Sequence, residues 1–202
     1  MAVLPLCARL GTGQDVSCVP VQRKYYQQAV LINKTDIVPD PAAVTKTDYE
    51  IAPETPLYNV TFALKPGTKG YRFSGSENGS VYFGRTNKST SDLGMPQYSQ
   101  EVQILIVGAG QPTKAILEAI DKGSFVVAMQ FGDGTIEIYG YDNGLSTGDY
   151  TYSIQENGGG TTIVLSSNEI SPESSHPFVY ISETLGQETE DFDSAFEVPA
   201  TP

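Results

Sequence analysis

The residues that come closest to a known chemistry are the eight of Gly108-Ala109-Gly110-Gln111-Pro112-Thr113-Lys114-Ala115. They follow an alternating apolar stretch and precede a helical pattern, as a phosphate-binding loop would. A P-loop needs glycine where Thr113 stands, so that the backbone can wrap the phosphates, and a hydroxyl where Ala115 stands, to reach magnesium. The dinucleotide-binding fingerprint also needs glycine at Thr113. We therefore predict an ordinary turn and helix start, with no nucleotide cofactor.

Other candidates for metal binding or catalysis are few. Asp133, Asp142 and Asp149 lie in Gly-rich turns, but their spacing matches no calcium loop and is typical of hairpin turns. His176 is the only histidine, and no serine or thiol is marked as its partner in a catalytic triad. No pair of carboxylates stands out for glycoside hydrolysis. The sequence therefore predicts no catalytic, metal-binding or cofactor-binding residue, and a protein that is not an enzyme.

Cys7 and Cys18 are the only two cysteines. They could bridge a short loop in an oxidising compartment, although two lone cysteines are more often unpaired. No apolar run approaches the roughly 20 residues that cross a membrane. The start of the chain also lacks the basic and apolar regions of a signal peptide. We therefore expect no membrane span, and synthesis in a cytoplasm.

The composition suits one β-rich domain with irregular ends, since 39% of the 202 residues are hydrophobic and 18% are charged. Acidic residues number 24 and basic residues 12, for a formal net charge of -12. Binding to nucleic acid depends on clustered lysine and arginine, which release counterions from the phosphates. This negative charge therefore opposes binding to DNA, and we expect DNA only to move past the protein without being bound.

Residues 101–144 show the clearest succession of elements. Alternating apolar residues predict a strand, a proline opens a predicted helix, and two further strands flank a Gly-Asp-Gly turn. We expect Gly123 to end the helix in a left-handed cap. The predicted fold is therefore mainly β, a sandwich or barrel with one short flanking helix. The predicted elements are a strand over 102–106, a helix over 113–122 and strands over 125–131 and 136–141.

Elsewhere, prolines and glycines separate short strands. The buried strand Ala29-Val30-Leu31-Ile32 precedes residues 38–56, where four prolines predict an extended loop. Polar residues predict another loop over 85–98, and the glycines of 157–160 predict a hairpin turn. The other expected strands are 57–64, 71–73 and 80–84, which would form a meander, 149–155 and 161–166, which would pair, and 178–181.

We divide the chain into three parts. Residues 1–26 have weak periodicity and form an N-terminal arm, and residues 27–182 form the β domain, which includes the loop 38–56. Residues 183–202 are rich in glutamate and aspartate. We expect this acidic C-terminal tail to be mobile, or to be ordered only by a neighbouring subunit.

Three runs carry a resemblance to a known family: residues 114–127 (KAILEAIDKGSFVV), 138–145 (IYGYDNGL) and 158–167 (GGGTTIVLSS). In order and spacing they resemble the tail-tube and related tail-ring proteins of tailed bacteriophages, particularly phages of gut Bacteroidetes. The similarity covers residues 27–182 and is strongest from residue 101 onwards. It rests on residues of the fold pattern and includes no catalytic signature.

The resemblance implies a tail-tube-like β-sandwich or barrel whose copies join into a closed ring around the channel that carries DNA out of the capsid. It implies a place in the virion tail, synthesis in the host bacterial cytoplasm, and contacts with neighbouring tail, connector or portal proteins. DNA would be passing cargo, repelled by the acidic channel. The long loop and the acidic tail exceed a minimal tube subunit, which leaves open a single ring of a short tail, as in crAss-like phages.

A second class of function remains open. A β-sandwich with twelve tyrosines and no tryptophan could be a glycan- or receptor-binding module of a phage fibre or an adhesin. Such a module would stay small and bind sugar through loops at one end of the sandwich. A ring subunit would instead form closed oligomers, with its extended arms ordered on assembly.

Overall fold

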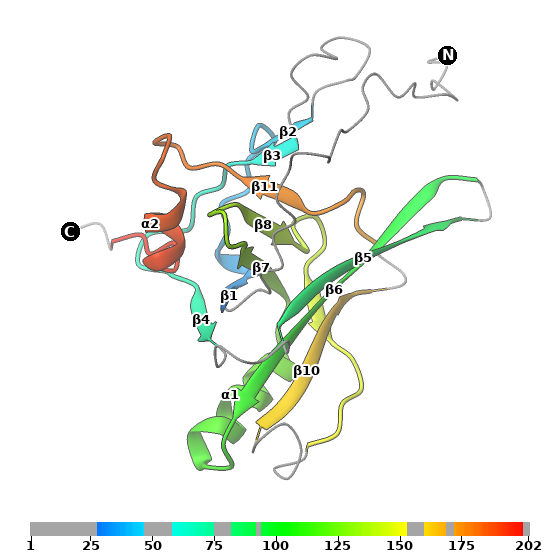
Figure 1. The fold of residues 1–202 in the computed structure, drawn as a ribbon, viewed down its shortest axis with the longest axis vertical. Coiled ribbons are helices and arrows are strands. Elements are labelled where there is room, and N and C mark those ends of the chain that lie inside the picture. The colour runs from blue at the N-terminus through cyan, green and yellow to red at the C-terminus, as the bar shows by residue number, and fades with distance from the viewer. Residues whose placement is uncertain are drawn as a thin grey trace.

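Two buried strands, β1 (Gln28–Asn33) and β7 (Phe125–Gln130), pair antiparallel inside the sheet. Their sequences, QAVLIN and FVVAMQ, carry no charged residue, and successive side chains point to opposite faces of a strand. A strand that is apolar on both faces must be covered on both faces. Accordingly, these two strands lie within the body of the protein in the computed structural model (Figure 1).

The structure describes residues 28–46, 58–74, 82–91, 94–152, 160–168 and 172–199. Within these ranges one sheet of 11 strands has the order β2-β3-β11-β8-β7-β9-β10-β6-β5, with β1 paired to β7 and to β4. Of the strand pairs within these ranges, β3 with β11 is parallel and all the others are antiparallel. The remaining strands are β2 (Val44–Lys46), β3 (Tyr58–Val60), β4 (Tyr71–Ser74), β5 (Phe83–Thr90), β6 (Pro96–Val107), β8 (Ile136–Tyr139), β9 (Leu145–Thr147), β10 (Gly160–Ser167) and β11 (Phe178–Tyr180).

Helices are few and short in this part of the chain. A 3-10 helix, Lys34–Asp36, follows β1, and α1 (Gln111–Asp121) packs the side chains of Leu117 and Ile120 towards the sheet. A second α-helix, α2 (Glu188–Asp193), lies near the C-terminus. The prediction of a mainly β, sandwich-like fold with a short flanking helix is confirmed.

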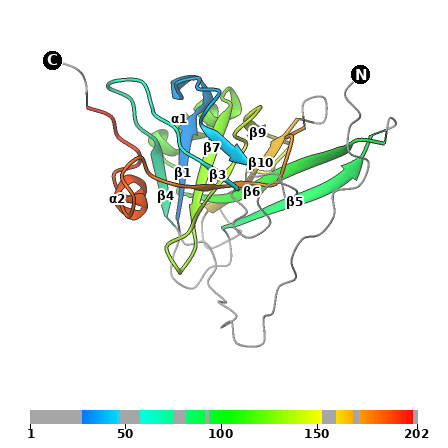
Figure 2. The same ribbon diagram turned by 90° about the horizontal axis from the view of Figure 1, so that it is seen from above.

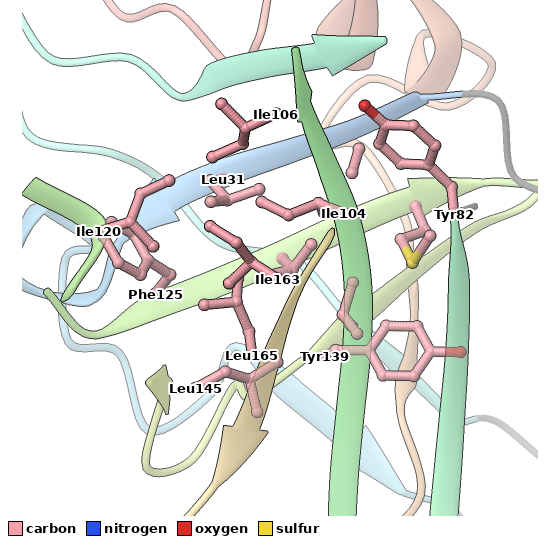
Figure 3. Packing of buried hydrophobic residues seen from close by; sticks show 14 of the residues in the cluster. Leu31, Tyr82, Ile104, Ile106, Ile120, Phe125, Tyr139, Leu145, Ile163 and Leu165 are labelled. Carbon is pink, nitrogen blue, oxygen red and sulfur yellow. The ribbon is translucent and has the colours of Figure 1, made fainter. Parts of the chain in front are cut away.

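Apolar side chains cover the two faces of β1 and β7 as two separate clusters. On one face, residues of β6, β10 and α1 complete the cluster, and Leu31, Ile104 and Leu165 meet there (Figure 3). On the other face, β8, β11 and the C-terminal segment complete a second cluster that includes Val30 and Phe178. The sheet thus bends into a sandwich-like body with a core on each side of β1 and β7.

The end of α1 differs in detail from the prediction. The residue that caps it, Lys122, has a φ of -100°, and Gly123 is not among the residues with positive φ, so the expected left-handed cap is wrong. Glycine is required at position 123 for another reason. A Cβ atom there would lie 2.1 Å from Cζ of Phe125, whose ring belongs to the first core cluster.

We expect Gly123→Val to lower the free energy of unfolding by about 1–3 kcal/mol, because the ring of Phe125 would have to move within a close-packed core. The measurement is urea denaturation followed by circular dichroism. Gly148→Val is the matched control, because no atom lies within 4 Å of a Cβ built at Gly148. Equal stability of the two variants would contradict this account of Gly123.

Several predicted loops and pairings are wrong. Most of residues 85–98 belong to β5 and β6, which form a hairpin whose exposed side chains are polar and therefore show no apolar alternation. Strands β3 and β4 lie in different parts of the sheet and form no meander. Strand β10 pairs with β6 and β9, and residues 149–152 form no strand.

Within the predicted loop 38–56, residues 44–46 form β2. Residues 47–56 lie outside the described residues, as do 75–81, 153–159 and the arm 1–26.

The C-terminal segment, residues 183–199, is also unlike the prediction. Phe192 is 0% exposed and Phe196 is 7% exposed, and both rings belong to the second core cluster. Val198 exchanges backbone hydrogen bonds with Gly67 and Thr68 (2.9 and 3.1 Å). The expectation that this segment is mobile, or is ordered only by a neighbouring subunit, is therefore wrong, because two phenylalanines tie it to the core despite its acidic surface.

Candidate functional site

The segment 108–115, which came closest to a phosphate-binding loop, is a turn followed by the first residues of α1. Gly108 has a φ of 104°, and Gly110 caps the helix without a side-chain hydrogen bond. The hydroxyl of Thr113 lies 3.5 Å from the carbonyl oxygen of Val107, so it faces the turn itself. The segment is therefore a turn and a helix start, as predicted.

The structure keeps the other candidate residues apart from one another. The carboxylate of Asp133 accepts a hydrogen bond from the Thr135 backbone (2.9 Å) within the β7–β8 turn, and Asp149 is exposed. Over the described residues, no three of the histidine, cysteine and acidic side chains form a group that could hold a metal ion. His176 is exposed, with its ring centroid 4.6 Å from that of Tyr98. Cys7 and Cys18 lie outside the described residues.

Asp142, by contrast, lies in a distinctive loop between β8 and β9, residues 140–144, which we call the corner loop. Here the chain passes from β8, which pairs with β7, to β9, which pairs with β10. Gly140 and Gly144 both have positive φ (70° and 82°). The Gly144 N–H donates to the Gly140 carbonyl (2.9 Å). A Cβ at Gly140 would lie 2.6 Å from Cγ of Leu145, so this corner needs glycine for both its dihedral angles and its space.

A buried carboxylate holds the corner loop. Glu173 is 2% exposed, and its two oxygens accept hydrogen bonds from the backbone N–H groups of Asp142 (2.9 Å) and Asn143 (3.0 Å). In return, the carboxylate of Asp142 accepts a hydrogen bond from the backbone N–H of Ser174 (3.1 Å), and the Asn143 amide donates to Pro172 (2.9 Å). The corner loop and residues 172–174 therefore clamp each other.

Burial raises the pKa of the Glu173 carboxyl above its usual range, and the neighbouring Asp142 carboxylate adds to the rise. The two backbone N–H donors and the Lys34 ammonium group act in the opposite direction. Lys34 itself donates a hydrogen bond to the Tyr141 carbonyl, and its pKa is lowered by burial. The two backbone N–H donors of the corner loop thus hold this carboxylate in place.

A second buried polar side chain, Gln100, joins this clamp to β6. Its amide oxygen accepts from the Gly140 N–H (2.8 Å), and its amide nitrogen donates to the Ser175 carbonyl (2.9 Å). Two residues earlier, Tyr98 exchanges backbone hydrogen bonds with Glu173 (3.0 and 3.4 Å). We call this group of Gln100, Glu173 and the corner loop the anchor cluster. It fixes the middle of β6 to the body.

Beyond the anchor cluster, β5 and β6 continue as a hairpin that leaves the body. Residues 101–107 of β6 pair with β10, whereas residues 96–99 pair with no described strand other than β5, and Tyr98 alone among them forms a bridge to Glu173. Figures 1 and 2 show this end of the hairpin extending away from the other strands. We call residues 85–91 and 94–99 the projecting hairpin.

The surface of the projecting hairpin is mainly polar, although Met95 is 54% exposed. Residues 87–90 are Asn, Lys, Ser and Thr, and all four are exposed. At its base, Arg85 donates a hydrogen bond to the Glu101 carboxylate on the facing strand (2.7 Å). Among the described strands, β6 is the only partner of β5, so the other edge of β5 is unpaired there. The arrangement offers a mainly polar strand edge, at which another chain could pair by backbone hydrogen bonds.

Sequence reasoning missed both buried members of the anchor cluster. Glu173 lies in the run Ser-Pro-Glu-Ser-Ser, and Gln100 precedes an alternating apolar stretch. Neither position carries a pattern that marks a buried polar group.

No helix within the described ranges has the length and apolar character needed to cross a membrane. Comparison of the chain with protein-family models, with curated proteins and with solved structures found no match.

Proposed function

We propose that this chain is a structural virion protein of a bacteriophage tail, whose copies assemble into a ring or tube that forms part of the DNA-ejection channel. The observation that carries the proposal is the projecting hairpin, which extends from the body and has an unpaired strand edge among the described strands. The sequence resemblance over residues 27–182 supports the same reading. No catalytic residue or cofactor enters this proposal.

An unpaired strand edge is a place where another chain can add by backbone hydrogen bonds. Natural proteins cover or twist away such edges unless they use them, and closed rings of identical subunits leave no edge open. The polar side chains of the projecting hairpin limit indiscriminate sticking before assembly. The anchor cluster at its base holds the hairpin in a fixed direction, as repeated contact between identical subunits requires.

The charge of the chain supports DNA as passing cargo. The net charge is -12, and residues 183–199 contain six acidic and no basic residues. A channel with a negative surface repels the phosphate backbone and lets DNA slide without being held. In this proposal the partners are other copies of the chain and neighbouring tail, connector or portal proteins. The protein would be made in the host bacterial cytoplasm and carried in the virion tail.

Electron microscopy and light scattering across a range of concentrations test the proposal directly. We expect rings or tubes with a central channel for the wild-type protein. Lys88→Glu adds negative charge to the exposed face of the projecting hairpin, and we expect it to raise the concentration needed for assembly about tenfold, which corresponds to ~1.4 kcal/mol. Lys114→Glu is the matched control, because it makes the same charge change on an exposed position of α1.

Monomers at every concentration, with no effect of either variant, would contradict assembly through the hairpin. A screen against surface glycans would then test the second class of function. An equal loss of assembly in Lys88→Glu and Lys114→Glu would show that net charge, and not the hairpin, controls association.

A further inference from the structure

A groove of about 780 Å³ lies between β4, α1 and the end of α2, and Leu31 of β1 and Phe125 of β7 also contribute to its lining. One wall is the apolar face of α1 with Ile116, Ala119 and Ile120, and Tyr71 and Phe73 of β4 also line the groove. Residues 193–195 line it as well. Ile116 is 41% exposed and Tyr71 is 55% exposed, so large apolar side chains face solvent there.

One of the strands that line this groove, β4, has an unpaired edge. β4 pairs with β1 and with no other strand that the structure describes. Just before β4, Gly70 donates a backbone hydrogen bond to Ala195 (2.7 Å), so the C-terminal segment covers that stretch. Four residues, Tyr71–Ser74, remain, which correspond to about 13 Å of strand. We call this stretch and its walls the edge groove.

The edge groove suits an extended segment with apolar side chains on one face. Tyr71 and Phe73 lie opposite Leu31 and Ala29 of β1 and so share the face that α1 covers. A strand added to β4 would continue that face and place alternate side chains against α1. The projecting hairpin is too polar for this role, because its exposed residues are mainly hydroxyl, amide and lysine side chains.

The N-terminal segment, residues 1–27, has the required chemistry. It contains the apolar runs Ala2-Val3-Leu4-Pro5-Leu6 and Val16-Ser17-Cys18-Val19-Pro20-Val21, and proline is tolerated on edge strands. It also carries three basic residues and one acidic residue, whereas the rest of the chain carries 9 basic and 23 acidic residues. The segment is therefore the cationic part of a strongly anionic chain.

We propose that residues 1–27 of one copy add as a strand to β4 of a neighbouring copy and fill its edge groove. This inference rests on the proposed assembly of identical subunits and names a second contact between them, besides the projecting hairpin. Identical anionic subunits repel one another, and a cationic segment that crosses between them offsets the repulsion. Fully extended, 27 residues reach about 90 Å, well beyond the roughly 17 Å radius of gyration of a 202-residue domain.

Disulfide cross-linking of the full-length protein tests this contact, because Cys7 and Cys18 both lie in the N-terminal segment and are the only native cysteines. Ile116→Cys places a thiol in the wall of the edge groove. After mild oxidation, we expect covalent dimers and larger species in which peptide mapping finds position 116 linked to Cys7 or Cys18. Tyr71→Cys offers a second exposed position in the same groove.

Two controls set the background. Leu185→Cys places a thiol at an 83% exposed position that does not line the groove, and we expect at least tenfold less cross-linked product from it. Ile116→Cys combined with Cys7→Ser and Cys18→Ser should lose the product. A disulfide formed within one chain, or equal yields from Ile116→Cys and Leu185→Cys, would overturn the proposal.

The same samples, imaged by electron microscopy, separate this inference from the proposed function. Rings without a cross-link between position 116 and the N-terminal cysteines would overturn the docking of the segment and leave the assembly standing. Monomers without any such cross-link would overturn both.

Discussion

Replacing Phe192 with alanine is expected to lower the free energy of unfolding by about 3–5 kcal/mol, the range for truncating a buried phenylalanine. Phe192 is 0% exposed and packs edge-on against Phe196, with ring centroids 6.3 Å apart. Arg72 lies over its ring at 5.6 Å and donates a hydrogen bond to its carbonyl (2.9 Å). Truncation would leave a cavity under the C-terminal segment and loosen its attachment to β4.

Urea denaturation of the purified variant measures this loss. Leu185→Ala is the matched control in the same segment, because an 83% exposed side chain contributes little to the core, and we expect it to change stability by less than about 0.5 kcal/mol. Wild-type stability of Phe192→Ala would show that the C-terminal segment does not belong to the fold in solution.

Replacing Glu173 with alanine is expected to cost about 2–4 kcal/mol. The change would remove the acceptor for two backbone N–H groups of the corner loop, and an unsatisfied buried donor costs about 1–3 kcal/mol. Because Glu173 also pairs through its backbone with Tyr98, we expect faster hydrogen exchange in the corner loop and in the adjoining part of β6. Glu183→Ala, at an exposed glutamate, is the matched control.

The pH dependence of stability provides a separate check on Glu173. Its pKa is raised in the folded protein, so its contribution is complete below the ordinary glutamate pKa of about 4.3 and is lost as the pH rises through the higher, folded value. Between these two pKa values, Glu173 has lost its proton in the unfolded chain but still holds it in the folded protein, so a rise in pH favours unfolding. Glu173→Gln should remove this fall in stability. An unchanged pH profile in Glu173→Gln would contradict the assignment.

The elements that sequence predicted correctly are those whose pattern is local. β1 and β7 are continuous apolar runs, and the turn before β8 contains Gly-Asp-Gly, so each carries its own signal. Most of β5 was missed, beyond the predicted strand 80–84, because a hairpin that leaves the body has no buried face, and so its apolar residues do not alternate with polar ones. The choice of strand partners was also wrong where partners lie far apart in the chain, as for β4 with β1.

The anchor cluster could not be predicted because it depends on partners that only the fold brings together. Gln100 and Glu173 meet the corner loop from distant parts of the chain, and a buried polar residue differs from an exposed one only in its surroundings. The attachment of the C-terminal segment to the core was not predicted for a related reason. Its six carboxylates outnumber its two core phenylalanines, and the turn that returns Phe196 to the core uses left-handed residues, Ala195 and Phe196, which no glycine marks.

The pairing of β1 with β7 has a consequence for the synthesis of the protein on the ribosome. Ala29 pairs with Met129, so β1 is translated one hundred residues before its partner, which at about 5–20 residues per second amounts to roughly 5–20 s. For the first 44 residues of that interval the apolar run Ala29-Val30-Leu31-Ile32 has neither partner, since Ala29 pairs with Phe73 of β4, and afterwards it still lacks β7. A nascent chain of this kind is a natural client for chaperones that shield emerging hydrophobic segments, and codon choice between residues 33 and 125 would set how long the shielding must last.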